Sequence, residues 1–102
     1  MNARTKHTRI NQATKKIVWN RDGGCCVVCG KPVDVSLSNA HIVPRSKGGS
    51  GEEQNIVTLC PVCHFMLDQT THRKKMMEMV IEYIRNIYPD WDEQEQKFKK
   101  GI

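Results

Sequence analysis

Four cysteines, in two Cys-x2-Cys pairs, are the residues whose spacing points most directly to chemistry. The pairs are Cys26/Cys29 and Cys60/Cys63. In a reducing compartment, two such pairs in one small chain favour a zinc site over disulfides or thioredoxin-like chemistry. We therefore expect the four thiolates to hold one structural Zn2+. Cys25 is left over and could replace Cys26, but the spacing from Cys26 to Cys29 fits a zinc knuckle better.

A second group of polar side chains lies between and just after the cysteine pairs. It contains His41, Asn55, His64 and Asp68. His64 and Asp68 are four residues apart, so on a helix both would project from one face. A divalent cation readily accepts an imidazole together with a carboxylate. His41 would point at the same face if the register of its strand places it inward.

Length and composition limit the classes of protein that this chain can belong to. Its 102 residues suffice for one domain with a modest core, which a metal ion would help to stabilise. No apolar run is long enough to cross a membrane, and the first ten residues lack the apolar stretch of a secretory signal. We expect a cytoplasmic location and no membrane partner. The formal net charge of +5 is compatible with a polyanionic partner.

Hydrophobic spacing and turn residues predict the elements that must position these side chains. Helices are expected over 12–21, 61–70 and 71–88, and antiparallel strands over 38–43 and 56–59. Asp22-Gly23-Gly24 should end the first helix, and Pro61 suits the first turn of the second. The Met-rich stripe of the third helix, from Met76 to Ile87, is interpreted mainly as core packing.

The two ends of the chain differ in character from its middle. Residues 1–12 are basic and almost without apolar side chains, so they are interpreted as a solvated arm that is either disordered or in contact with phosphates. Residues 13–88 form the single predicted domain. Residues 89–102 carry Trp91 and Phe98 among charges, which is compatible with a short helix folded back or with a frayed tail.

Two stretches of the sequence closely resemble the HNH endonuclease motif in its four-cysteine zinc variant. They are 40–49, with His-Ile-Val-Pro and then Gly-Gly, and 55–64, with Asn and then Cys-Pro-Val-Cys-His. The resemblance runs from about Cys26 to Asp68, and this order of motifs is very specific. It implies an α+β fold, with a small zinc-stabilised ββα-metal (His-Me finger) core and flanking helices.

The resemblance also implies roles for individual residues. His41 would be the general base that takes a proton from water, and a neutral imidazole is suited to that task at physiological pH. His64 would bind the catalytic cation, such as Mg2+, Mn2+ or Ni2+, which contacts the scissile phosphate. Asn55 would brace the loop that holds His41 in line.

The chain departs from the family pattern at one position. Many members carry Asp, Glu or His immediately before the base as a metal ligand, whereas this chain has Ala40, which cannot coordinate an ion. Asp68 is the expected replacement, because related nucleases use a second ligand one helical turn beyond the first. Ser38, Asn39 and His72 are weaker candidates, and water and phosphate oxygens would complete the shell.

The resemblance implies a metal-dependent endonuclease that hydrolyses DNA phosphodiester bonds, by nicking or cutting and with little sequence preference of its own. Arg45 and Lys47, which follow the motif directly, are the preferred phosphate contacts, with Lys31 and 73–75 as further candidates. Stand-alone chains of this size resemble those of bacteriophages and prophages. That likeness makes a phage DNA-packaging (terminase) complex in the bacterial host cell a candidate partner.

Two other classes of function stay open from the sequence. Ala40 makes a zinc-stabilised DNA-binding module without catalysis plausible. An accessory of a larger nuclease or packaging complex, docking through the Met-rich helix or Trp91, is the third interpretation. The sequence does not give the oligomeric state.

Overall fold

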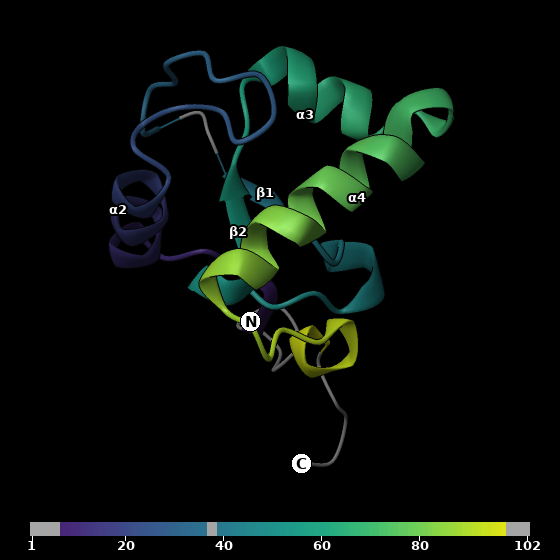
Figure 1. Cartoon of the computed structure of the whole chain (residues 1–102). Coiled ribbons are helices and arrows are strands. Elements are labelled where there is room, and N and C mark those ends of the chain that lie inside the picture. The colour runs from purple at the N-terminus through teal and green to yellow at the C-terminus, as the bar shows by residue number, and fades with distance from the viewer. Residues whose placement is uncertain (1–6, 37–38, 98–102) are drawn as a thin grey trace.

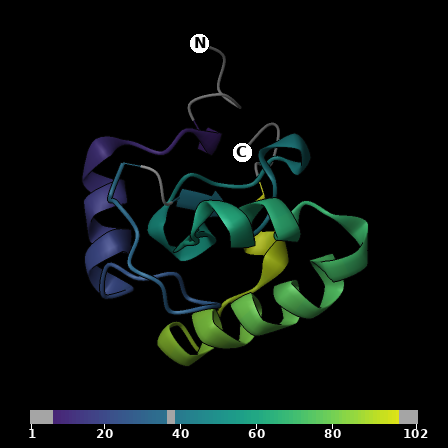
Figure 2. The ribbon, with the colours of Figure 1, turned by 90° about the horizontal axis from the view of Figure 1, so that it is seen from above.

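A computed structural model describes residues 7–36 and 39–97 and shows a small α+β fold (Figure 1). Its helices are α2 (Gln12–Arg21), α3 (Pro61–Leu67) and α4 (Thr70–Ile87), and its strands are β1 (Asn39–His41) and β2 (Ile56–Thr58). Seen from above, α3 lies over the hairpin of β1 and β2, and α4 runs along its side (Figure 2). No helix in the described ranges has both the length and the apolar character that a membrane crossing requires.

The antiparallel hairpin is shorter than the sequence predicted. Asn39 pairs with Thr58, Ala40 with Val57 and His41 with Ile56. Beyond His41 the chain keeps one more backbone bond, from Ile42 N to Asn55 O, and then turns to the side chain of Asn55. The predicted strand 38–43 therefore ends early because an amide side chain takes over the pairing that a strand backbone would provide. Ser38 lies outside the described residues.

The boundary between the two helices after the hairpin lies earlier than expected: the first ends three residues earlier and the second begins one residue earlier. Helix α3 begins at Pro61, with Cys60 as its N-cap, and ends at Leu67. Asp68 is the C-cap of α3, and α4 begins at Thr70. The expected helix 61–70 is thus too long, but Asp68 still follows His64 by one helical turn.

Helix α2 is fastened to the rest of the fold by a buried carboxylate. Asp22, its C-cap, accepts hydrogen bonds from Thr58 N (2.8 Å) and from the Tyr83 hydroxyl on α4 (2.6 Å). It also pairs with Arg21 at 2.8 Å. Arg21 in turn donates to the Ile56 carbonyl of β2. One carboxylate therefore joins α2, β2 and α4. The predicted turn at Asp22 ends α2 and leads into the segment that carries the first cysteine pair.

The Met-rich helix supplies most of one wall of the core. Met76, Val80 and Ile84 are buried, as the stripe predicted, whereas Met79 is 43% exposed. The stripe is therefore narrower than expected. The core continues through both strands and the cysteine knuckles, and its members outside α4 include Cys26, Val33, Ala40, Ile42, Val43, Val57, Leu59, Leu67 and Trp91.

From residue 7 onward the N-terminal segment is only partly solvated, because Arg9, Asn11 and Gln12 are exposed while other residues contact the domain. Thr8 is only 3% exposed, and the His7 carbonyl accepts a hydrogen bond from Gly51 N at 2.9 Å. A Cβ added at Gly51 would lie 2.0 Å from the Arg9 carbonyl oxygen, so the two backbones are in close contact. Asn11 then caps α2. Residues 1–6 lie outside the described part.

The C-terminal segment folds back onto the domain. Trp91 is buried, and its indole N–H donates to the Gln54 carbonyl at 2.7 Å. A short 3-10 helix follows at Glu93–Gln96, and Ser50 N donates to the Gln96 carbonyl. Of the two expectations for the tail, the folded-back short helix is the one that the structure shows up to Lys97.

Candidate active site and metal centre

The four predicted cysteines converge at one point. Cys26 and Cys29 follow α2, Cys60 and Cys63 begin α3, and their four sulfur atoms all lie within 4.8 Å of one another. The Cys29 and Cys60 sulfurs are 3.6 Å apart. In a tetrahedral zinc–thiolate site with Zn–S bonds of about 2.3 Å, sulfur atoms are about 3.8 Å apart. The four thiols are therefore placed to hold a metal ion, and Cys25 stays outside the group.

The electrostatics of this cluster favour a bound cation. Burial works to raise the pKa of the Cys26 thiol, but backbone hydrogen bonds, that from Cys29 foremost, lower it to about 7. Burial and the neighbouring sulfurs raise the pKa of the Cys63 thiol. Four thiolates so close together repel one another, and a divalent ion would remove that repulsion. The knuckles thus fit the expected structural metal.

The hairpin and the helix after it bring His41 and His64 to one cavity. The cavity has a volume of about 190 Å³. His41 enters it from β1, and His64 and Asp68 enter it from α3 and its C-cap. The register of the hairpin therefore places His41 at the same cavity as His64 and Asp68. The other lining residues are Asn39, Ile42, Pro44, Arg45, Leu67, Arg73 and Met77.

The N-terminal segment fixes the tautomer of His41. Its Nε2 lies 2.8 Å from the Thr8 carbonyl oxygen, which can only accept a hydrogen bond, so Nε2 carries the hydrogen. In the neutral ring, Nδ1 then keeps its lone pair. Burial lowers the pKa of His41; the Thr8 bond opposes this, and the positive charges of Arg45 and His64 lower it further. A neutral His41 with a basic Nδ1 follows.

Asn55 is positioned to brace the chain just after His41. It is fully buried. Its side-chain oxygen accepts from Val43 N (2.8 Å), and its amide nitrogen donates to the carbonyls of Val43 (3.1 Å) and Ser50 (2.8 Å). These contacts tie the side chain of Asn55 to the backbone that follows β1.

Position 40 does not face the cavity. Successive side chains of a strand point to opposite faces, and Ala40, at 1% exposure, lies in the core. Its neighbours Asn39 and His41 line the cavity instead. A carboxylate at position 40 of this backbone would therefore enter the apolar core. Among the described residues, the four cysteines alone form a group of three or more His, Cys, Asp or Glu close enough to hold an ion.

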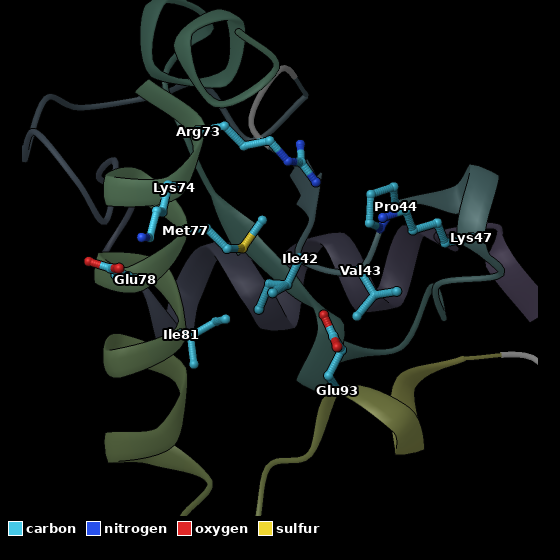
Figure 3. A pocket seen from close by; sticks show the side chains of 10 residues that line it. All are labelled: Ile42, Val43, Pro44, Lys47, Arg73, Lys74, Met77, Glu78, Ile81 and Glu93. Atoms are coloured by element: carbon cyan, nitrogen blue, oxygen red, sulfur yellow. The ribbon is translucent and has the colours of Figure 1, made fainter. Parts of the chain in front are cut away.

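The basic residues near the cavity come from two elements. Arg45, in the 3-10 turn Arg45–Lys47, and Arg73, on α4, line the cavity itself. Lys47, Arg73 and Lys74 line a second, larger cavity of about 470 Å³ beside it (Figure 3). In Figure 3, Met77 and Ile81 of α4 point across this second cavity toward Ile42. The predicted phosphate contacts Arg45 and Lys47 thus line two neighbouring cavities that share Arg73 and Met77, whereas Lys31 lines neither.

Sequence reasoning missed two features of the site. The first is the Thr8 carbonyl, which is a backbone group and therefore cannot be predicted from a residue type. Arg73 was considered only within a basic run, and its place between the two cavities depends on how α4 packs.

The hairpin, the following helix and the four clustered cysteines define a small ββα module with a candidate metal centre. The model of the HNH endonuclease family matches residues 26–69, the part that holds both cysteine pairs, His41, Asn55 and His64. The chain belongs to the HNH endonuclease family.

Two relatives place this module among known proteins. Anaredoxin of Nostoc sp. (strain PCC 7120 / SAG 25.82 / UTEX 2576) is 39% identical over 53% of this chain and 70% of its own length. The Type IV methyl-directed restriction enzyme EcoKMcrA of Escherichia coli (strain K12) is 30% identical over 72% of this chain, but over only 29% of its own length. The chain therefore corresponds to less than a third of that enzyme.

Proposed function

We propose that this protein is a metal-dependent endonuclease that hydrolyses DNA phosphodiester bonds, by nicking or cutting and with little sequence preference. The observation that carries the proposal is the shared cavity of His41, His64 and Asp68, in which the Nδ1 of His41 is left as a base. The family and the restriction-enzyme relative support a nuclease.

The proposed hydrolysis begins at His41. Its Nδ1 takes a proton from a water molecule in the cavity, and the resulting hydroxide attacks the phosphorus of the scissile phosphate. The bond from phosphorus to the 3′ oxygen breaks, and that oxygen takes a proton from a second water molecule. The positive charge that His41 then carries is stabilised by the Thr8 carbonyl, which already accepts the Nε2 hydrogen. Asn55 holds the backbone of Val43, two residues further on, so that the imidazole stays in line with the phosphate.

His64 and Asp68 fit a catalytic cation, because an imidazole nitrogen and a carboxylate oxygen face one cavity. When bound there, Mg2+, Mn2+ or Ni2+ would supply stabilisation of the negative charge on the phosphate and on the departing 3′ oxygen. Arg45 and Arg73 line the same cavity and would neutralise further phosphate charge.

The basic residues suggest the course of the DNA strand. Arg73 lines both the cavity of His41 and the neighbouring cavity, which Lys47 and Lys74 also line. Cations spaced along a recess contact successive phosphates irrespective of sequence, which supports the expectation of little intrinsic specificity. A phage packaging partner and a cytoplasmic location stay predictions of the sequence.

We infer that the metal of the four cysteines is zinc. A tetrahedral set of four thiolates suits Zn2+, but it also suits iron, and one relative bears the name anaredoxin. Elemental analysis of the purified protein identifies the metal directly. The visible absorption spectrum gives a second test, because ferric thiolates absorb visible light and Zn2+ does not. One equivalent of zinc in a colourless protein is the expected result.

Nicking of supercoiled plasmid tests the endonuclease. Purified protein is incubated with plasmid and Mg2+, Mn2+ or Ni2+, and the assay is repeated with His41→Ala and with His72→Ala. His72 is exposed on α4 and does not line the cavity, so it is the matched control. Loss of the general base should lower the nicking rate by about 10²–10⁴-fold, with His72→Ala unchanged.

Two outcomes would contradict the proposal. Nicking that survives His41→Ala would mean that His41 is not the base. DNA binding without nicking under every ion would favour the non-catalytic DNA-binding module, the second candidate.

A further inference from the structure

One polar atom in the proposed active site has no hydrogen-bond partner. The side-chain oxygen Oδ1 of Asn39 is buried, and no described residue donates to it. A buried acceptor without a donor destabilises a fold, so native structures rarely keep one without a reason such as a ligand or an ion.

The place of Asn39 makes this oxygen informative. Asn39 is the first residue of β1, two before His41, so both side chains project from the same face of the strand. It lines the cavity that His64 and Asp68 line from α3. A residue whose side-chain oxygen has no donor thus lines the cavity in which an imidazole and a carboxylate are already available.

The chemistry of the oxygen fits a hard divalent cation. Mg2+ and Mn2+ prefer oxygen ligands, and the carbonyl oxygen of an Asn side chain is among those that such ions accept. Ala40, the residue directly before His41, lies in the core and offers no donor atom. Asn39 supplies an oxygen from the neighbouring position on the face that lies toward the cavity.

Resting on the proposed function, we propose that Asn39 is the third protein ligand of the catalytic cation, together with His64 and Asp68. The ion would take the role of donor to Oδ1, which would explain why the fold leaves this atom without a protein partner. Water and phosphate oxygens would complete the shell, as the small number of protein ligands requires.

Direct measurement of Mn2+ binding tests this assignment without relying on activity. Three proteins are compared: the original chain, Asn39→Ala and Asn39→Asp. Each is first loaded with zinc at its cysteine site and is then titrated with Mn2+ in an isothermal titration calorimeter. We expect Asn39→Ala to weaken Mn2+ binding about tenfold or more. Asn39→Asp adds a charged oxygen at the same place and should tighten it about tenfold. Asn86→Ala, exposed on α4, is the matched control and should change nothing.

A substitution at the neighbouring position separates this proposal from the family pattern. Ala40→Asp would place a carboxylate in the apolar core, so it should destabilise the fold and should not tighten Mn2+ binding. If Ala40→Asp folds and binds Mn2+ more tightly than Asn39→Asp, position 40 is the ligand position and our assignment is wrong. Circular dichroism and zinc content establish which variants are folded.

The titrations are repeated with duplex DNA in the His41→Ala background, because phosphate oxygens strengthen a weak site. The assignment is overturned if Asn39→Ala and the original chain bind Mn2+ equally in both conditions, or if neither binds it. Equal binding is also what a water molecule on Oδ1 would give. Binding that depends on Asn39 without plasmid nicking would remove the proposed function and leave the metal site. Nicking with Mn2+ binding that does not depend on Asn39 would leave the proposed function and remove the assignment of Asn39 as a ligand.

Discussion

Replacing Asn55 by Asp tests the brace behind His41 with almost no change of shape. The side chain of Asn55 makes three hydrogen bonds with backbone groups, of which two are donated by its amide nitrogen to the carbonyls of Val43 and Ser50. An aspartate keeps the acceptor for Val43 N but cannot donate to either carbonyl. It also turns a buried negative oxygen toward the two carbonyl oxygens.

The structure sets the size of the expected effect. Two buried carbonyls without a donor cost about 1–3 kcal/mol each, so Asn55→Asp should lower the free energy of unfolding by about 2–6 kcal/mol. The free energy of unfolding of the whole domain is expected to be about 5–15 kcal/mol, or about 0.05–0.15 kcal/mol per residue. The loss would therefore be a large share of the stability. Asn86→Asp, at an exposed position on α4, should cost at most about 1 kcal/mol.

Urea unfolding followed by circular dichroism measures these differences, at a fixed excess of zinc because bound metal adds to apparent stability. The effect of pH separates the causes. Burial disfavours the charged form of the introduced carboxyl, and protonation gives it a hydrogen to donate. The deficit of Asn55→Asp relative to the original chain should therefore shrink between about pH 7.5 and about pH 6, whereas that of Asn55→Ala should not.

The reasoning would be refuted by an unchanged urea midpoint for Asn55→Asp. It would also fail if Asn55→Asp and Asn55→Ala had the same dependence on pH, because the loss would then not come from the two carbonyls.

Three further predictions concern the base, the N-terminal segment and the metal centre. Because burial lowers the pKa of His41 from its ordinary 6.5, the neutral base persists as pH falls through 6.5, so nicking at saturating Mn2+ should decline only below that value; a decline centred above it contradicts this. Gly51→Ala places a Cβ 2.0 Å from a carbonyl oxygen of the N-terminal segment, so it should reduce nicking by about tenfold or more with zinc retained. Gly23→Ala, which strains only its own left-handed backbone (φ +70°) and meets no neighbour, should not. Cys63→Ser should abolish the folded circular-dichroism spectrum, and His64→Ala should keep it; equal loss would make His64 structural.

Much of the fold follows from spacing that can be counted along the chain. The antiparallel hairpin, the helix that begins at Pro61 and the amphipathic α4 were predicted near their observed positions. The errors are at boundaries where a side chain competes with the backbone, as when Asn55 takes over the pairing after His41. The N-terminal segment was misjudged because it is held by backbone contacts, which depend little on composition.

The sequence by itself determined the candidate metal-binding cysteines and the membership of the HNH family. Two cysteines with two residues between them can turn their sulfur atoms toward one point, and the motif order is specific. Only the tertiary structure decided which side chains share a cavity with His41. The strand register decides which of Asn39 and Ala40 lies on the side of the cavity. The tautomer of His41 depends on the backbone carbonyl of Thr8, which is distant in the sequence. Neither a register nor a backbone acceptor has a residue type of its own, so both become visible only when the chain is folded.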